Sequence, residues 1–110
     1  MSLTHRAPMR LFTILLDYRG GTYIRQVSAR SVENAIRKWA RSKVWSGIPN
    51  VGRREREMAN GFLSNVGDPV EIERTKNVWC SEALVRGHLA MVHVVETVRE
   101  PTRGRKGTSP

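Results

Sequence analysis

DYRGGTYIRQVSARSVENAIRKWARSKVW, residues 17–45, holds a glycine pair, a run of β-forming residues and a basic helix in one continuous segment. A phosphate-binding loop places its glycines at the N-terminus of a helix, where free N–H groups point at the anion. Here residues 22–29 read as a strand that separates Gly21 from the helix, and neither GxGxxG nor GKS/T occurs. The pair Gly20-Gly21 therefore predicts a two-residue hairpin loop, since glycine adopts the positive φ that such loops require.

The hairpin joins residues 9–18, MRLFTILLDY, to residues 22–29, TYIRQVSA, and both segments are rich in β-formers. Placing Gly20-Gly21 in the loop gathers large apolar residues on one side, which a hairpin that covers a core needs. The cross-strand pairs predicted by this register are Tyr18 with Tyr23, Ile14 with Val27, and Phe12 with Ala29.

The helix is expected to start after Arg30, with Ser31 as a good N-cap and Glu33 in the first turn. Apolar residues then recur at helical spacing and form one stripe. The stripe consists of Val32, Ala35, Ile36, Trp39 and Ala40, and the opposite side carries Asn34, Arg37, Lys38 and Arg41. The residues SGIP at 46–49 end the helix, because glycine and proline do not continue it.

The remaining segments predict a short helix within 53–63, a short edge strand at 70–74, and a final hairpin of residues 77–85 and 88–99 joined at Arg86-Gly87. The expected fold is α+β: an antiparallel sheet of about four or five strands in the order β-β-α-(short α)-(β)-β-β, with one main amphipathic helix packed on one face. Residues 9–99 form a single domain, residues 1–8 a flexible N-terminus, and residues 100–110 a disordered basic tail.

Both faces of the first hairpin carry large apolar residues, since Leu11, Leu15 and Ile24 oppose the side that the helix covers. A sheet with one solvated face shows cleaner alternation. The second face is therefore expected to be covered, either by residues 53–63 or by another copy of the chain, and a homodimer is the favoured interpretation.

Charge is the strongest compositional signal: nineteen Lys and Arg against ten Asp and Glu give a net charge of +9 and a pI near 11.0. This balance favours a polyanionic partner, which can be nucleic acid, an anionic membrane or an acidic protein, although a GC-rich genome would also enrich arginine. No apolar run has the length of a membrane helix, which needs roughly 20 residues, so no membrane partner is expected. The single cysteine excludes an intrachain disulfide and favours the cytoplasm.

A nucleic-acid surface is predicted along the exposed side of the helix and in the tail. If the helix continues past Lys43, Trp45 emerges among the cations and stacks on a base; if the helix ends earlier, Trp45 folds back onto the core. The interleaved charges of residues 53–57 predict only a solvated helix start. The predicted nucleic-acid-binding residues are Arg30, Arg37, Lys38, Arg41, Trp45, Arg103, Arg105 and Lys106.

The last hairpin brings Cys80, Glu82 and His93 to one face in either of two registers, and Cys80 opposes His93 if the loop is Arg86-Gly87. A cysteine, a histidine and an orienting carboxylate can form a thiol nucleophile, which makes a thiol enzyme the third hypothesis. No metal motif or cofactor motif is present, and a buried structural cysteine is the ordinary alternative. The sequence thus predicts a small basic non-enzymatic binding module, with a homo-oligomeric interaction module as the second hypothesis.

Overall fold

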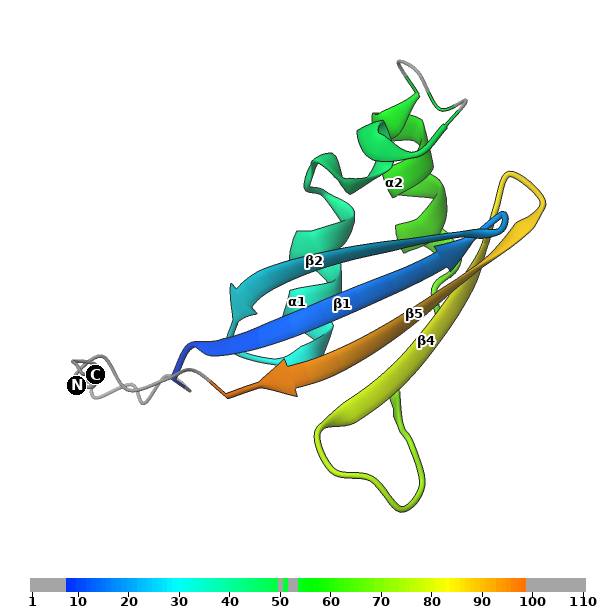
Figure 1. The fold of residues 1–110 in the computed structure, drawn as a ribbon. Coiled ribbons are helices and arrows are strands. Elements are labelled where there is room, and N and C mark those ends of the chain that lie inside the picture. Colours follow the sequence, from blue (N-terminus) through cyan, green and yellow to red (C-terminus); the bar gives the residue numbers. More distant parts are fainter. Residues whose placement is uncertain (1–7, 50, 52–53, 99–110) are drawn as a thin grey trace, which may run out of the picture.

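The computed structural model of the protein describes residues 8–49, 51 and 54–98. Within this part of the chain, five antiparallel strands form one sheet in the order β2-β1-β5-β4-β3, and two α-helices pack beside it (Figure 1). This arrangement confirms the predicted α+β fold. The elements are β1 (Arg10–Tyr18), β2 (Gly21–Ala29), α1 (Val32–Ala40), the 3-10 helix η1 (Lys43–Gly47), α2 (Glu55–Asn65), β3 (Val70–Glu71), β4 (Val78–Val85) and β5 (His88–Thr97).

The first hairpin turns one residue earlier than the glycine pair predicts. Tyr18 pairs with Gly21, so the loop consists of Arg19 and Gly20, which have φ of 50° and 85°. Two positive φ values are the signature of a type I′ turn, the geometry that matches the twist of a tight hairpin. The predicted pairing is wrong by two residues, but a shift of two keeps the same side chains on the core face.

Gly21 lies in β2, where its lack of a side chain serves a different purpose. A Cβ atom at this position would lie only 2.5 Å from the hydroxyl oxygen of Tyr23 and 2.8 to 2.9 Å from two of its ring carbons. The glycine therefore makes room for the tyrosine ring, and Gly20 alone of the pair supplies a positive φ. The sequence alone does not separate these two roles, so it predicts the loop one residue too late.

The second hairpin has the same kind of turn. Val85 pairs with His88, and the loop residues Arg86 and Gly87 have φ of 52° and 79°. Cys80 is the partner of His93, which confirms the first of the two predicted registers. Both Arg-Gly turns lie at the same end of the sheet (Figure 1).

Helix α1 forms as its sequence predicts. The Ser31 hydroxyl accepts a hydrogen bond from the Asn34 N–H at 3.1 Å, which caps the first turn. All five residues of the predicted apolar stripe are buried against the sheet. The helix ends at Ala40, several residues before the segment SGIP.

Trp45 lies in the core, so the expectation that it emerges among the cations is wrong. After Ala40 the chain bends into η1, and this bend turns the indole inward until none of it is exposed. Its Nε1–H donates to the Ala40 carbonyl at 2.9 Å, which satisfies the indole and one free carbonyl of the helix end. The ring packs against Trp39 and Phe62, with centroid separations of 5.5 and 5.8 Å.

Helix α2 confirms the predicted short helix but lies on the same side of the sheet as α1 (Figure 1). Its buried residues Met58, Ala59 and Phe62 join the core that α1 already covers, and Phe62 packs against Trp39 at 5.4 Å. The expectation that this segment covers the second face of the sheet is therefore wrong. Within the described part of the chain, no helix lies on that face.

We predict that Trp45→Ala lowers the free energy of unfolding by about 3–5 kcal/mol, because it removes a fully buried aromatic ring and leaves a cavity. Chemical denaturation measures this change. Val98→Ala is the control, since that side chain is 89% exposed and should change the free energy by less than about 0.5 kcal/mol. A similarly small loss for Trp45→Ala would contradict the burial of the ring.

We also predict an acid-dependent contribution from the ion pair between β1 and β5. Arg10 donates to both carboxylate oxygens of Glu96, at 2.9 and 3.0 Å, and this pairing holds the pKa of Glu96 below its usual value. The stabilisation is therefore complete above the usual carboxyl range and is lost as the pH falls through the lower folded-state value. In Glu96→Gln, the decline of stability over this acid range should be shallower, as measured by denaturation at a series of pH values.

Candidate polyanion-binding face

The helical layer carries most of the unpaired positive charge of the described chain. Between residues 30 and 65 the described cations outnumber the acids seven to three. The cations are Arg30, Arg37, Lys38, Arg41, Lys43, Arg54 and Arg56, and the acids are Glu33, Glu55 and Glu57. This layer is called the basic helical face below.

Three of the predicted site residues lie together on the exposed side of α1. Arg37, Lys38 and Arg41 are all exposed, and among the described residues the side chain of neither arginine has an ion-pair or hydrogen-bond partner. Lys38 differs, because its Nζ donates to the Ser28 carbonyl at 2.8 Å and so ties α1 to the edge strand β2. The two arginines are therefore free to bind an anion, whereas Lys38 already has a structural contact.

The other predicted residues are less available. Arg30 is only partly exposed, its Nε is enclosed without a partner, and its carbonyl accepts a hydrogen bond from Arg10. Trp45 is buried, as are Trp39 and Phe62, so these rings give the basic helical face no platform for base stacking. Arg103, Arg105 and Lys106 lie outside the described residues.

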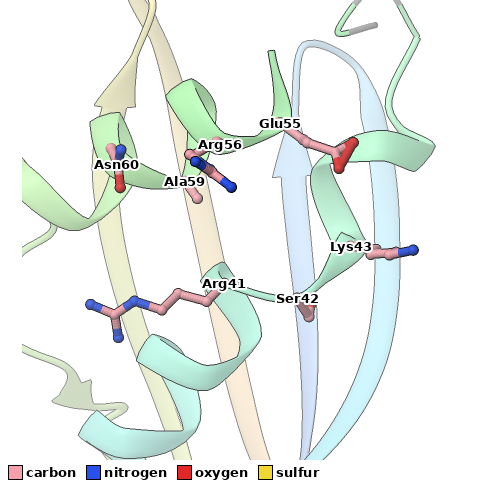
Figure 2. Close-up of a pocket in the computed structure, with 7 residues that line it drawn as sticks. All are labelled: Arg41, Ser42, Lys43, Glu55, Arg56, Ala59 and Asn60. Carbon is pink, nitrogen blue, oxygen red and sulfur yellow. The ribbon is translucent and has the colours of Figure 1, made fainter. Parts of the chain in front are cut away.

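A broad hollow of about 900 Å³ lies between the end of α1, η1 and the start of α2 (Figure 2). Its charged lining residues are Arg41, Lys43 and Arg56, with Glu55 as the one acid among the described lining residues. In Figure 2, Arg41 and Lys43 extend to opposite sides of Ser42, and Arg56 faces them from α2. We call this hollow the helical groove.

Arg56 and Lys43 are the groove cations that the predicted binding residues do not include, and Arg56 is the more distant of the two from α1 in sequence. Its neighbours Glu55 and Glu57 make the local segment of mixed charge, which argued for an ordinary solvated helix start. Glu57, however, is paired with Arg86 at 2.7 Å across the fold. The packing of α2 beside α1 places Arg56 and Arg41 in the lining of one hollow, and no local pattern in the sequence signals that arrangement.

The opposite face of the sheet has a different chemistry. Leu15 of β1 pairs with Ile24 and His93, His93 pairs with Cys80, and Cys80 pairs with Val70, so these five side chains form one row across all five strands. Both ends of the row are exposed, Ile24 by 64% and Val70 by 67%. We call this surface the open sheet face, and none of its described strand positions holds Lys or Arg.

Cys80, Glu82 and His93 share the open sheet face, as both registers predicted. Burial raises the pKa of the Cys80 thiol, and the carboxylate of Glu82 raises it further. A raised pKa disfavours the thiolate at neutral pH, whereas nucleophilic cysteines need a lowered one. In the described part of the chain, no group of three or more His, Cys, Asp or Glu residues could hold a metal ion.

The sequence matches no known protein family, and neither a curated protein nor a solved structure shows significant similarity to it. None of the helices among residues 8–49 and 54–98 is long and apolar enough to cross a membrane.

We predict that Cys80 reacts with iodoacetamide more slowly at neutral pH than a free cysteine, because its raised pKa leaves less thiolate. As the chain has one cysteine, the alkylation rate against pH reports this thiol alone. The midpoint should lie above that of a cysteine peptide and should fall in Glu82→Gln. A midpoint below that of the peptide would instead support the thiol-enzyme hypothesis.

Proposed function

We propose that the protein is a small non-enzymatic module that binds the phosphate backbone of nucleic acid through the basic helical face. The observation that carries this proposal is the helical groove, which Arg41, Lys43 and Arg56 line from the end of α1, from η1 and from α2, with Glu55 as the only acid in its described lining. Arg41 and Arg56 have no ion-pair partner among the described residues, so their charge is available to an anion. Guanidinium groups suit this ligand because each one can donate two hydrogen bonds to a pair of phosphate oxygens.

The mechanism is phosphate neutralisation with little reading of base sequence. Each phosphate that a cation neutralises releases condensed counterions, and this release drives binding. Because Trp39, Trp45 and Phe62 are all buried, none of these three rings is available on the basic helical face to stack on a base. Affinity is therefore expected to fall steeply with salt and to vary little with sequence.

We predict that Arg41→Ala/Arg56→Ala weakens binding to duplex DNA by about tenfold, taking roughly 0.7 kcal/mol for each lost surface contact. The slope of log K against log salt should become shallower by about 0.9 for each lost phosphate contact. Fluorescence anisotropy with labelled DNA at several salt concentrations measures both quantities.

Arg74→Ala is the matched control, because Arg74 is an exposed cation in the loop between β3 and β4, outside the groove. Its loss should leave the salt slope unchanged. Equal effects of the groove variant and the control would show that binding depends on the net charge of the chain and not on the groove. Absence of binding at low salt would remove the proposal altogether.

A second function, self-association, is supported by the open sheet face. In a chain with nineteen Lys and Arg, a face of strands without either residue is unusual, and its exposed apolar side chains remain uncovered by the described chain. Such a face suits an apolar partner and not a polyanion. We infer that the partner is a second copy of the chain, packed sheet to sheet with the helices outside.

The size of the face fits this partner. Four strands of about nine residues, spaced about 4.8 Å apart and rising about 3.3 Å per residue, span roughly 570 Å² before side-chain relief is counted. Stable interfaces take about 800 Å² from each partner, so the face approaches the standard size.

The acids Asp17 and Glu82 lie in the row beside the one that runs from Ile24 to Val70, and Met91 pairs with both of them.

We predict that the protein sediments as a dimer and that Ile24→Lys/Val70→Lys shifts it to the monomer, because each lysine would be desolvated in the apolar row. Sedimentation velocity over a concentration series tests this outcome. Thr75→Lys adds the same kind of charge in an exposed loop and should leave the dimer intact. A wild-type protein that stays monomeric at high concentration would contradict self-association.

A further inference from the structure

A second, smaller hollow lies at the end of the sheet where both hairpins turn. Its volume is about 200 Å³, and it lies on the other side of the start of α2 from the helical groove. The lining residues that concern its chemistry are Arg19, Arg54, Arg86, His88, Tyr18 and Met58. We call it the turn pocket.

The turn pocket draws a cation from each of three separate segments. Arg19 lies in the turn between β1 and β2, Arg86 lies in the turn between β4 and β5, and Arg54 directly precedes α2. No Asp or Glu belongs to its described lining. Glu57, which lies outside this lining, pairs with Arg86 at 2.7 Å, so Arg19 and Arg54 carry the unpaired positive charge of the pocket.

Both turn arginines occupy backbone positions that seldom take arginine. Arg19 and Arg86 have φ of 50° and 52°, in the left-handed region, where a β-carbon meets steric strain. Type I′ turns favour Asn, Asp or Gly at this position. Arg74 also has a positive φ but lies outside the pocket, so the feature that points to a role for Arg19 and Arg86 is that both line the same hollow.

These cations also have few competing partners. The side chains of Arg19 and Arg54 make no ion pair or hydrogen bond among the described residues, and Arg86 makes one exposed ion pair, with Glu57. The Tyr18 hydroxyl donates to the Val85 carbonyl at 2.8 Å. Burial raises the pKa of Tyr18, and the charges of Arg19 and Arg86 oppose this rise.

We propose that the turn pocket binds the phosphate group of a phosphomonoester, held by Arg19, Arg54 and Arg86. Guanidinium groups approaching from different sides match the several acceptor oxygens of a phosphate better than the two of a carboxylate. Whole drug-sized ligands fill about 300–1,000 Å³, so a hollow of about 200 Å³ suits a head group whose remainder projects into solvent. The phosphate belongs either to a free nucleotide or to the phosphorylated end of a nucleic-acid strand.

Inorganic phosphate is the first probe, titrated into the full chain and followed by calorimetry. We expect saturable binding that weakens by about tenfold or more in Arg19→Gly, since a charge-assisted contact is lost. Glycine is free of strain at a positive φ, so this variant should unfold at the same denaturant concentration or higher. Loss of binding in a protein that is equally or more stable separates a ligand role from a structural one.

Arg74→Gly is the matched control, because Arg74 also has a positive φ, of 67°, and also loses one charge, but lies outside the pocket. It should bind phosphate as the wild type does. Arg54→Gln tests the third cation without altering either turn, and it should weaken binding as Arg19→Gly does. Absence of saturable phosphate binding, or equal binding by Arg19→Gly and Arg74→Gly, would overturn the proposal.

Two further ligands identify the source of the phosphate. Tighter binding of a nucleoside monophosphate than of inorganic phosphate, lost in Arg19→Gly, supports a free nucleotide. A preference for a 5′-phosphorylated oligonucleotide over its 5′-hydroxyl counterpart, lost in the same variant, supports a strand end. The 5′-hydroxyl oligonucleotide also keeps the two proposals apart, because its binding should depend on Arg41 and Arg56 and not on Arg19.

Discussion

The buried aromatic cluster of Trp39, Trp45 and Phe62 is the contact on which the rest of the structure depends. Each ring comes from a different element, α1, η1 and α2, and the three centroids lie within 5.4 to 5.8 Å of one another. Tyr18 joins the cluster to the sheet through Trp45. Because large buried rings dominate core energetics, this cluster holds both helices on one face of the sheet. The charge and the shape of each surface follow from that placement.

Packing both helices on one face gives the protein two chemically different sides. The apolar sides of α1 and α2 meet the sheet, so their cations point outward and the end of α1 lies beside Arg56. The other side of the sheet keeps the apolar row from Ile24 to Val70 and holds no Lys or Arg at its described strand positions. A polyanion suits the first surface and a second copy of the chain suits the other, so the two proposed functions can operate in one molecule.

The two type I′ turns connect this architecture to the turn pocket. Antiparallel pairing through β1 and β5 places both Arg-Gly loops at one end of the sheet, although they are far apart in sequence. The start of α2 adds Arg54 to that end. The pocket and the helical groove thus lie on either side of one short stretch of chain at the start of α2.

Local periodicity determined the fold class, the apolar stripe of α1 and the faces of the strands, because the alternation of side chains depends only on neighbouring residues. The predicted faces of the strands stayed correct although the first turn was predicted wrongly, because a shift of two residues in the pairing leaves each side chain on the same face. The exposure of Arg37 and Arg41 was likewise predictable, because both lie on the side of an amphipathic helix opposite its apolar stripe. The tertiary structure alone decided that α1 stops at Ala40, that Trp45 turns inward and that α2 shares the face of α1, because these outcomes depend on which distant rings fit together in the core. Arg56 and the turn pocket escaped prediction for the same reason: their neighbours come from elements far apart in the chain.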